Sequence, residues 1–415
     1  MSRLEDLLQT LCPDGVEYVT LGDISIIDSS GVDKKIVSGE KIIFLLNYMD
    51  VYRNSFIDKS VITMQVTASD KKIASCDIQQ GDIFITPTSE TIEDLAHSAV
   101  AIETIEEAVY SYHIMRIRLK KKSMITSYYL NYLFRSEFLQ NQIMHYASGL
   151  TRFGLSRAKW LSLIIPLPPL PVQEEIVRIL DTFSGVVTEL EAEQAARARQ
   201  YEHYRQNLLF RCTESSTIAL ERVMLGEICH YSKESIDASE IDKDSYVGVD
   251  NLLQNKQGKV ASEFVPEKGR LIRYRAGNIL IGNIRPYLKK IWLADSEGGT
   301  NGDVLCIQIN DEAKTKIIPR FLYQILSSEE FFTYAINFMR GAGMPRGSKE
   351  MTMKYKFPVP PIEIQEQIVS ILDRFDALVN DLKSGLPAEI ALRRKQYEYY
   401  RDKLLTFPQK PGGVS

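Results

Sequence analysis

The feature that most constrains the fold is an internal repeat. The string RQYEHYRQNLLF at residues 199–210 returns near the end of the chain as KQYEYYRDKLL at residues 395–405. Other pairs follow in the same order: VTLGDI and VMLGEI, GDIFI and GNILI, GLTR and GMPR, and PLPPLPVQEEIVRILDTF and PVPPIEIQEQIVSILDRF. Matches that keep their order while their spacing drifts indicate a duplication followed by changes in loop length. The chain therefore consists of two similar halves.

Each half contains a variable body followed by a better matched segment. Short runs rich in β-branched residues dominate the bodies, for example residues 41–46 and 115–119, with one or two helices such as residues 127–145. Proline clusters around Pro168 and Pro360 mark the ends of the bodies, because such runs stop the preceding structure. We therefore expect an α+β fold with two pseudo-symmetric, mainly-β domains. The expected boundaries are 1–165 for the first domain, 166–217 for the first helical segment, 218–357 for the second domain, and 358–415 for the second helical segment and tail.

The matched segments have the heptad pattern of a coiled coil, with apolar residues at alternating steps of four and three. At about 1.5 Å per residue, about 38 residues extend about 57 Å. The second segment carries SGLP at residues 384–387, so we expect that helix to bend or break there. Gln194 and Arg197 interrupt the first seam, either as a solvated end of an imperfect coil or as a lock on its register. The seam residues are Ile176, Leu180, Phe183, Val187, Leu190, Tyr201, Tyr204, Leu208, Ile368, Leu372, Phe375, Val379, Leu382, Tyr397, Tyr400 and Leu404.

Familiar catalytic motifs are missing from the sequence. It has no glycine-rich phosphate or dinucleotide motif, no nucleophile elbow and no HExxH zinc motif. Its five cysteines and five histidines are scattered without metal-ligand spacing. The apolar stretches are too short to span a bilayer, and the N-terminus lacks the basic start of a secretory signal. We therefore expect a cytoplasmic binding protein without a metal or cofactor of its own, rather than an enzyme.

Basic residues gather at one place in the second half. The formal net charge of -4 argues against a uniformly basic surface but allows a local patch. Within GNIRPYLKK we expect a strand end and then a turn that exposes amide and guanidinium groups for base edges and ammonium groups for phosphates. A solvated basic loop is the alternative. The residues of this turn are Asn283, Arg285, Tyr287, Lys289 and Lys290.

The first half has different side chains at the equivalent place, where Thr86, Thr88 and Ser89 replace the basic run. Two bodies with one framework and different loop chemistry suggest two different targets. A second patch follows a glycine-containing turn in each half, and either a grip on a nucleic-acid backbone or structural capping explains it. A third pair of loops, residues 47–53 and 250–256, gives a weaker signal. The second patch comprises Arg152, Arg157 and Lys159, mirrored by Arg346, Lys349 and Lys354.

The doubled proline and helix motif resembles the specificity subunits of type I restriction-modification systems. The two PxPP segments, each ending in QYE-x-Y-R-x-x-LL, are similar to the conserved regions of that family. GNIRPYLKKIWLA and GMPRGSKE are similar to parts of its target-recognition domains. The resemblance covers essentially the whole chain. It implies two target-recognition domains that each read one half of a split DNA sequence, separated by two long antiparallel helices.

The resemblance also implies partners. Two methyltransferase subunits would bring S-adenosylmethionine and flip the target base out of double-stranded DNA. Two restriction subunits that use ATP and Mg²⁺ can join them, and this chain would bind none of these cofactors itself. Without the resemblance, two other interpretations stay open: a non-catalytic coiled-coil scaffold with ligand-binding β domains and, less favoured, a metal-dependent nuclease.

Overall fold

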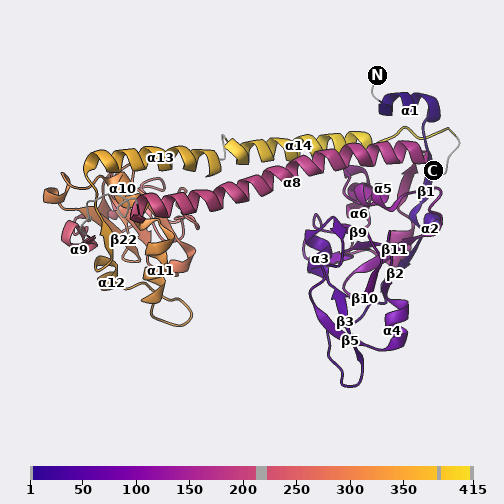
Figure 1. The fold of residues 1–415 in the computed structure, drawn as a ribbon, viewed down its shortest axis with the longest axis horizontal. Helices are drawn as coiled ribbons and strands as arrows, with labels where there is room; N and C mark the ends of the chain where they lie inside the picture. The colour runs from indigo at the N-terminus through magenta and orange to yellow at the C-terminus, as the bar shows by residue number, and fades with distance from the viewer. Residues whose placement is uncertain (1–2, 212–221, 381–384, 412–415) are drawn as a thin grey trace. The chain divides into compact units, whose positions relative to one another are not determined.

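The chain forms two compact units in the computed structural model, which describes residues 3–211, 222–380 and 385–411 (Figure 1). Unit 1 comprises Met1–Glu191 and Ile390–Ser415, and unit 2 comprises Ala192–Glu389. Each unit is a β-rich body on which long helices pack. The expected α+β class with two mainly-β domains is therefore confirmed.

Two sheets form most of the body of unit 1. Its strands are β1 (Glu17–Thr20), β2 (Ser25–Asp28), β3 (Lys41–Leu46), β4 (Phe56–Ile57), β5 (Gln65–Ala68), β6 (Asp77–Ile78), β7 (Ile83–Ile85), β8 (Thr88–Ser89), β9 (Ser98–Ala101), β10 (Ile105–Tyr110), β11 (Met115–Leu119), β12 (Phe153–Gly154) and β13 (Ile164–Leu167). One sheet has the order β2-β11-β7-β9-β4 and the other β5-β3-β10-β6, while β1-β13 and β8-β12 form separate pairs. Strands β3 and β11 coincide with the two β-branched runs cited above.

Short helices connect the strands of unit 1. They are α1 (Arg3–Leu11), α2 (Leu21–Ile24), α3 (Tyr48–Arg53), α4 (Asp70–Ser75), α5 (Ser127–Phe134), α6 (Glu137–Tyr146) and α7 (Arg157–Leu161). The helix expected over residues 127–145 is thus two helices. The reason is Ser136, which has an extended backbone and accepts a hydrogen bond from the Leu139 N–H, and so caps α6.

Unit 2 repeats this plan with fewer strands. Its elements are β14 (Arg222–Met224), α9 (Leu225–Ile228), β15 (Cys229–Tyr231), β16 (Ser235–Asp237), β17 (Tyr246–Val247), β18 (Arg270–Tyr274), β19 (Ile279–Gly282), η3 (Pro286–Leu288), β20 (Ile291–Leu293), β21 (Gly298–Thr300), β22 (Val304–Ile309), α10 (Pro319–Leu326), α11 (Glu329–Asn337), α12 (Lys349–Met353) and β23 (Lys356–Pro358). Its sheets are β15-β22-β19-β20 and β16-β18-β21-β17, and β14-β23 corresponds to β1-β13 of unit 1.

Long helices α8 (Leu170–Gln206), α13 (Ile362–Asn380) and α14 (Gly385–Leu404) follow the two bodies. In unit 1, Phe183 of α8 stacks on Tyr400 of α14 with ring centroids 5.1 Å apart, and Glu191 pairs with Arg394 at 2.5 Å. Because the contacts advance along α8 as they recede along α14, the two helices are antiparallel. Among the helices of the described ranges, none has an apolar stretch long enough to cross a membrane.

The seam residues differ in how deeply they are buried. Ile176 and Leu180 are fully buried in the core of unit 1, so they pack on the body as well as along the helix. In unit 2, Tyr201 and Tyr204 each stack with Phe375 at 6.3 Å, although Tyr204 is 45% exposed. The side chain of Val379 and the whole of Leu382 lie outside the described residues. The remaining seam residues, Val187, Leu190, Leu208, Tyr397 and Leu404, are partly buried, while Ile368 and Leu372 are buried.

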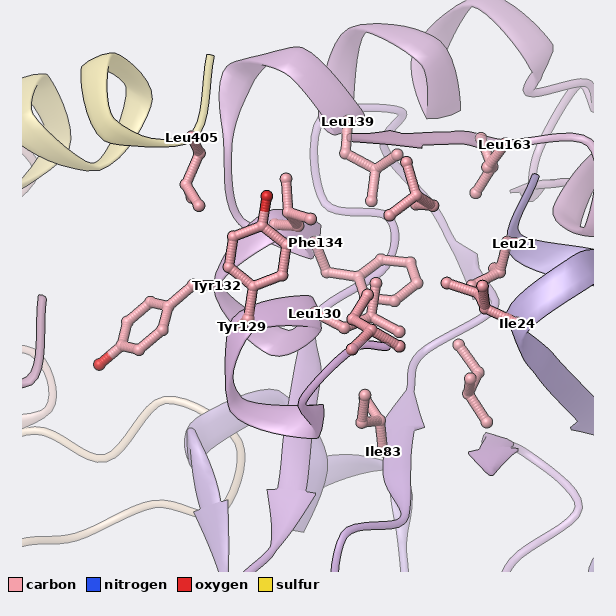
Figure 2. Packing of buried hydrophobic residues seen from close by; sticks show 14 of the residues in the cluster. Leu21, Ile24, Ile83, Tyr129, Leu130, Tyr132, Phe134, Leu139, Leu163 and Leu405 are labelled. Atoms are coloured by element: carbon pink, nitrogen blue, oxygen red, sulfur yellow. The ribbon is translucent and has the colours of Figure 1, made fainter. Parts of the chain in front are cut away.

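The repeated phrase closes the cores of both units. Leu405, at the end of the second copy, is one of the buried residues of the hydrophobic core of unit 1 (Figure 2). Beyond it the Phe407 carbonyl accepts a hydrogen bond of 2.7 Å from the Tyr18 hydroxyl, which ties the C-terminal segment to β1. Leu209 and its neighbour Phe210, in the first copy, are buried in the core of unit 2. Each copy therefore acts as an anchor at the end of a long helix.

A buried glutamine fixes the start of each long helical segment. The Gln173 amide oxygen accepts from the Thr126 N–H at 2.9 Å, and its nitrogen donates to the carbonyls of Met124 and Pro168 at 2.8 and 2.7 Å. Gln365 makes the same three bonds in unit 2, with Ile318, Lys316 and Pro360, at 3.1, 2.7 and 2.6 Å. Both side chains are completely buried.

Candidate nucleic-acid interface

Three segments that are distant in the sequence meet in unit 1. They are residues 47–53, 86–90 and 148–154, which together we call the first-unit face. The first of them was expected to be a loop but is helix α3 with its N-cap Asn47. Thr88 lies at their junction: its hydroxyl accepts from Arg152 Nε at 3.0 Å, and its carbonyl accepts from the Tyr48 hydroxyl at 3.3 Å. The backbone of Phe153 also pairs with that of Ser89. The structure thus brings together three patches that were separate candidates in the sequence.

The equivalent loops meet in unit 2. They are residues 249–258, 283–290 and 340–347, which together we call the second-unit face. The Asn255 N–H donates to the Leu288 carbonyl at 2.9 Å, and the Arg285 N–H donates to the Pro345 carbonyl at 2.7 Å. These bonds join the middle loop to both of its neighbours.

Each face includes a tight hairpin closed by backbone hydrogen bonds. In unit 1 the hairpin is closed between Ser148 and Gly154, and in unit 2 between Arg340 and Arg346. The enclosed loops have the same length, so Gly154 is the structural equivalent of Arg346. The expectation that Arg152 mirrors Arg346 is therefore wrong by two positions, because it aligned GLTR with GMPR without the closing bonds.

Several polar residues expected at the surface are buried. Thr86 is completely buried, and its backbone pairs with His97, so it belongs to the framework of the sheet. Ser89 and Asn283 are 7% and 6% exposed. The turn does not expose Asn283, and its backbone N–H donates to the Asp303 carbonyl at 2.9 Å. These three side chains can shape the faces but do not present donors on them.

The basic turn of unit 2 is only partly free for a ligand. Lys289 Nζ pairs with Glu329 at 2.5 Å, and Lys290 Nζ donates to a backbone carbonyl at 2.6 Å. Arg285 and Tyr287 have exposed side chains on either side of the buried Pro286. The exposed guanidinium and phenol, rather than the lysines, are therefore the groups that this turn offers.

The second basic patch divides between the faces and two short helices. Arg346 lies on the second-unit face, where Nε is 3.2 Å from Asp303. Lys159 of α7 lies 4.2 Å from the centre of the Tyr146 ring, and Lys354, directly after α12, pairs with Glu350 at 2.6 Å. Both lysines are thus engaged with their own body. Arg157 and Lys349, the first residues of α7 and α12, are exposed.

An aromatic row beside the first-unit face was missed by the sequence reasoning. Tyr48 and Tyr52 stack at 6.0 Å, and Tyr52 lies 4.3 Å from the His97 ring. Asp94 accepts from the Tyr52 hydroxyl at 3.1 Å and lies 2.8 Å from His97 Nε2. The two tyrosines four positions apart on α3 were the available signal, whereas the place of His97 depends on tertiary packing. A cavity of about 360 Å³ beside the row is lined by residues that include Arg53, Arg135 and Arg401.

Acidic, histidine and cysteine side chains do not gather into a metal site in the part of the chain that the structure describes. The chemistry that the two faces offer is that of recognition: guanidinium groups, a phenol, hydroxyl groups and backbone amides. Such groups bind phosphates and the edges of bases.

Comparisons with known proteins agree with this interpretation. The model of the type I restriction modification DNA specificity domain matches the chain twice, at residues 13–199 and 219–392. A putative type I restriction enzyme specificity subunit from Haemophilus influenzae is 30% identical over 288 residues, which is 67% of this chain and 73% of the relative. The specificity subunit of a type I restriction enzyme from Escherichia coli is 31% identical over 287 residues, which is 63% of this chain and 68% of the relative.

A solved structure from work on complex assembly and conformational transition of the type I restriction-modification system has the same fold. Its TM-score is 0.60 at 17% sequence identity, over 95% of this chain and 98% of that one. The two matches of one family model to a single chain correspond to the two halves found in the sequence. The chain therefore belongs to the family of type I restriction-modification DNA specificity subunits, the non-catalytic subunits that give these systems their DNA specificity.

Proposed function

We propose that this subunit recognises a bipartite site in double-stranded DNA, with the first-unit face reading one half and the second-unit face the other. One observation carries the proposal: in each unit, three segments distant in the sequence converge on one face with an exposed arginine, Arg152 or Arg285. The loop chemistry of the two faces differs, which suits two unlike half-sites. The recognition domains are residues 1–165 and 218–357 in this proposal.

Each residue class has a distinct role in the proposal. Arg285 offers a planar fork for a guanine edge, and Tyr287 offers a ring and a hydroxyl beside it. On the first-unit face, Arg152 and Thr88 act as one hydrogen-bonded pair. The exposed bases Arg157, Lys349 and Arg346 contact phosphates. Lys289 and Lys290 are held by other groups of the protein, and Lys159 packs on the Tyr146 ring. Thr86, Ser89 and Asn283 hold the framework in place.

The partners follow from the function of the family. We infer that two methyltransferase subunits bind this chain and supply S-adenosylmethionine and base flipping, and that two restriction subunits with ATP and Mg²⁺ can join the complex. The helical segments, residues 166–217 and 358–415, set the spacing between the half-sites. A helix of about 57 Å is long compared with a DNA turn of about 34 Å.

Sequencing of modified bases tests the proposal. The chain and its modification subunit are expressed together in a host that lacks other methyltransferases, and methylated positions are mapped across the genome. The expected result is one new motif with two specified halves and an unspecified spacer. The modification subunit alone should give no such motif. A complex that forms and methylates without a bipartite motif would overturn the proposal.

A further inference from the structure

Strained backbone concentrates on the second-unit face. Six non-glycine residues in the described part of the chain have a positive φ, and four of them lie in two neighbouring loops of unit 2. The left-handed conformation is unfavourable for residues other than glycine, because Cβ approaches the following carbonyl oxygen. Something in the structure must hold these loops in place. The four residues are Asn255 (φ 54), Lys256 (φ 66), Arg285 (φ 50) and Lys289 (φ 52).

The two strained loops are bonded directly to each other. Asn255 N–H donates to the Leu288 carbonyl at 2.9 Å, and Lys256 N–H donates to the Lys289 carbonyl at 3.0 Å. Each of these two hydrogen bonds thus involves at least one strained residue, and together they join the backbones of the two loops. A change in either loop would be transmitted to the other.

One carboxylate forms ion pairs with a lysine of each loop. Glu329, the first residue of α11, pairs through Oε1 with Lys256 Nζ at 3.3 Å and through Oε2 with Lys289 Nζ at 2.5 Å. Lys256 Nζ also lies 4.0 Å from Glu202 of α8. The two lysines are only 23% and 26% exposed, so both ammonium groups are committed to the protein.

The electrostatics of this cluster agree with its geometry. Burial acts to raise the pKa of Glu329, but the hydrogen bond from Lys289 and the two ammonium charges outweigh it and lower that pKa. Burial is also the main cause that lowers the pKa of Lys256. The carboxylate is therefore charged at neutral pH, and it offsets part of the cost of burying the Lys256 ammonium.

We propose that Glu329 is a positioning residue for DNA specificity. By holding Lys256 and Lys289, it fixes the strained loops so that Arg285 and Tyr287 are presented to base edges. It also keeps two ammonium groups from contacting DNA phosphates. Such contacts would strengthen binding to every sequence equally. The inference rests on the proposed function and adds to it the source of discrimination on this face.

The test compares Glu329→Gln with Glu330→Gln in the complete complex with the modification subunits. Glu330 is the next residue, is exposed, and lies 4.0 Å from Arg222, so its variant has the same change in charge without touching the loops. Binding to target and non-target duplexes is measured over a range of salt concentrations. For Glu329→Gln we expect the ratio of target to non-target affinity to fall about tenfold or more, by analogy with the loss of one base contact.

The salt dependence separates positioning from simple loss of structure. Because one or two lysines become free for phosphates, the slope of log affinity against log salt for non-target DNA should steepen by about 1 to 2. Glu330→Gln should match the wild type in both measurements. The double variant Glu329→Gln with Lys289→Gln should lose part of the steeper slope without regaining discrimination.

Lys289→Gln alone removes the contact between Lys289 and Glu329 by changing the lysine instead of the carboxylate. It is the test variant if Glu329→Gln fails to fold. Discrimination should fall, while the salt slope should not steepen. The inference is overturned if a folded Glu329→Gln complex discriminates as well as Glu330→Gln, or if Lys289→Gln discriminates as well as the wild type. A wild-type complex that distinguishes no sequences would instead overturn the proposed function.

Discussion

The Nε of Arg152 lies 3.0 Å from the hydroxyl oxygen of Thr88, which joins a hairpin loop to a strand more than sixty residues away. The two residues belong to patches that look unrelated in the sequence. A guanidinium carries five donors, so this bond orients the group without using up its capacity. Thr88 thereby fixes the orientation of the arginine before any ligand arrives.

Arg152→Ala is expected to relax only one half of the DNA motif. A lost guanidinium contact to a base costs about 1–3 kcal/mol of discrimination at its position. Mapping of methylated sites should therefore show new bases tolerated in one half, with the other half unchanged. Lys122→Ala, which removes an exposed charge outside the first-unit face, serves as the control. Equal relaxation of both halves would contradict an independent first-unit face.

Arg285→Lys should affect the other half and reveal how the base is read. Lysine keeps the positive charge but lacks the planar fork of the guanidinium. We therefore expect affinity for non-target DNA to stay within about twofold, since the phosphate attraction is preserved. Specificity at one position of the second half-site should fall by about 1–3 kcal/mol. Competition binding with single-base variants of the site measures this, and an unchanged profile would exclude Arg285 as a base-reading residue.

The sequence predicted those features that depend on local or repeated patterns. Order-preserving repeats and heptads identify the halves and the long helices. The break expected at SGLP falls between α13, which ends at Asn380, and α14, which begins at Gly385, and residues 381–384 lie outside the described residues. Polar turn chemistry was less reliable, because Asn283 was expected to be exposed but is buried. Glu329 was missed because its two lysine partners come from distant loops. No local pattern encodes such a contact.

The stability of unit 2 is expected to fall at alkaline pH because of two buried thiols. Burial raises the pKa of both Cys229 and Cys306 to about 12. In the unfolded chain the thiols lose their protons near pH 8.5, whereas the folded chain retains them. The unfolded state thus binds fewer protons, and the free energy of unfolding decreases as pH rises from about 9 to 12. Denaturant titrations across this range measure the decrease.

The same thiols should resist alkylation in the folded protein. Iodoacetamide reacts with the thiolate, and at pH 8 a thiol with a pKa of about 12 is almost wholly protonated. Peptide-resolved labelling should show Cys229 and Cys306 reacting much more slowly than the partly exposed Cys12. In urea, all three should react at similar rates. Native labelling of Cys229 as fast as in urea would contradict its burial.

Gln173→Ala and Gln365→Ala should destabilise units 1 and 2 respectively, each by about 3 kcal/mol or more. Each glutamine makes three hydrogen bonds in a completely buried site, and removing it leaves a backbone N–H and two carbonyls without that partner. An unsatisfied buried polar group costs about 1–3 kcal/mol. Thermal unfolding should show a midpoint lower by about 6–12 °C, at about 2–4 °C per kcal/mol for units of this size. The controls Glu174→Ala and Glu366→Ala change the exposed next residue and should shift the midpoint by no more than about 2 °C. If a glutamine variant shifted it no further than its control, the start of that long helix would not depend on these bonds.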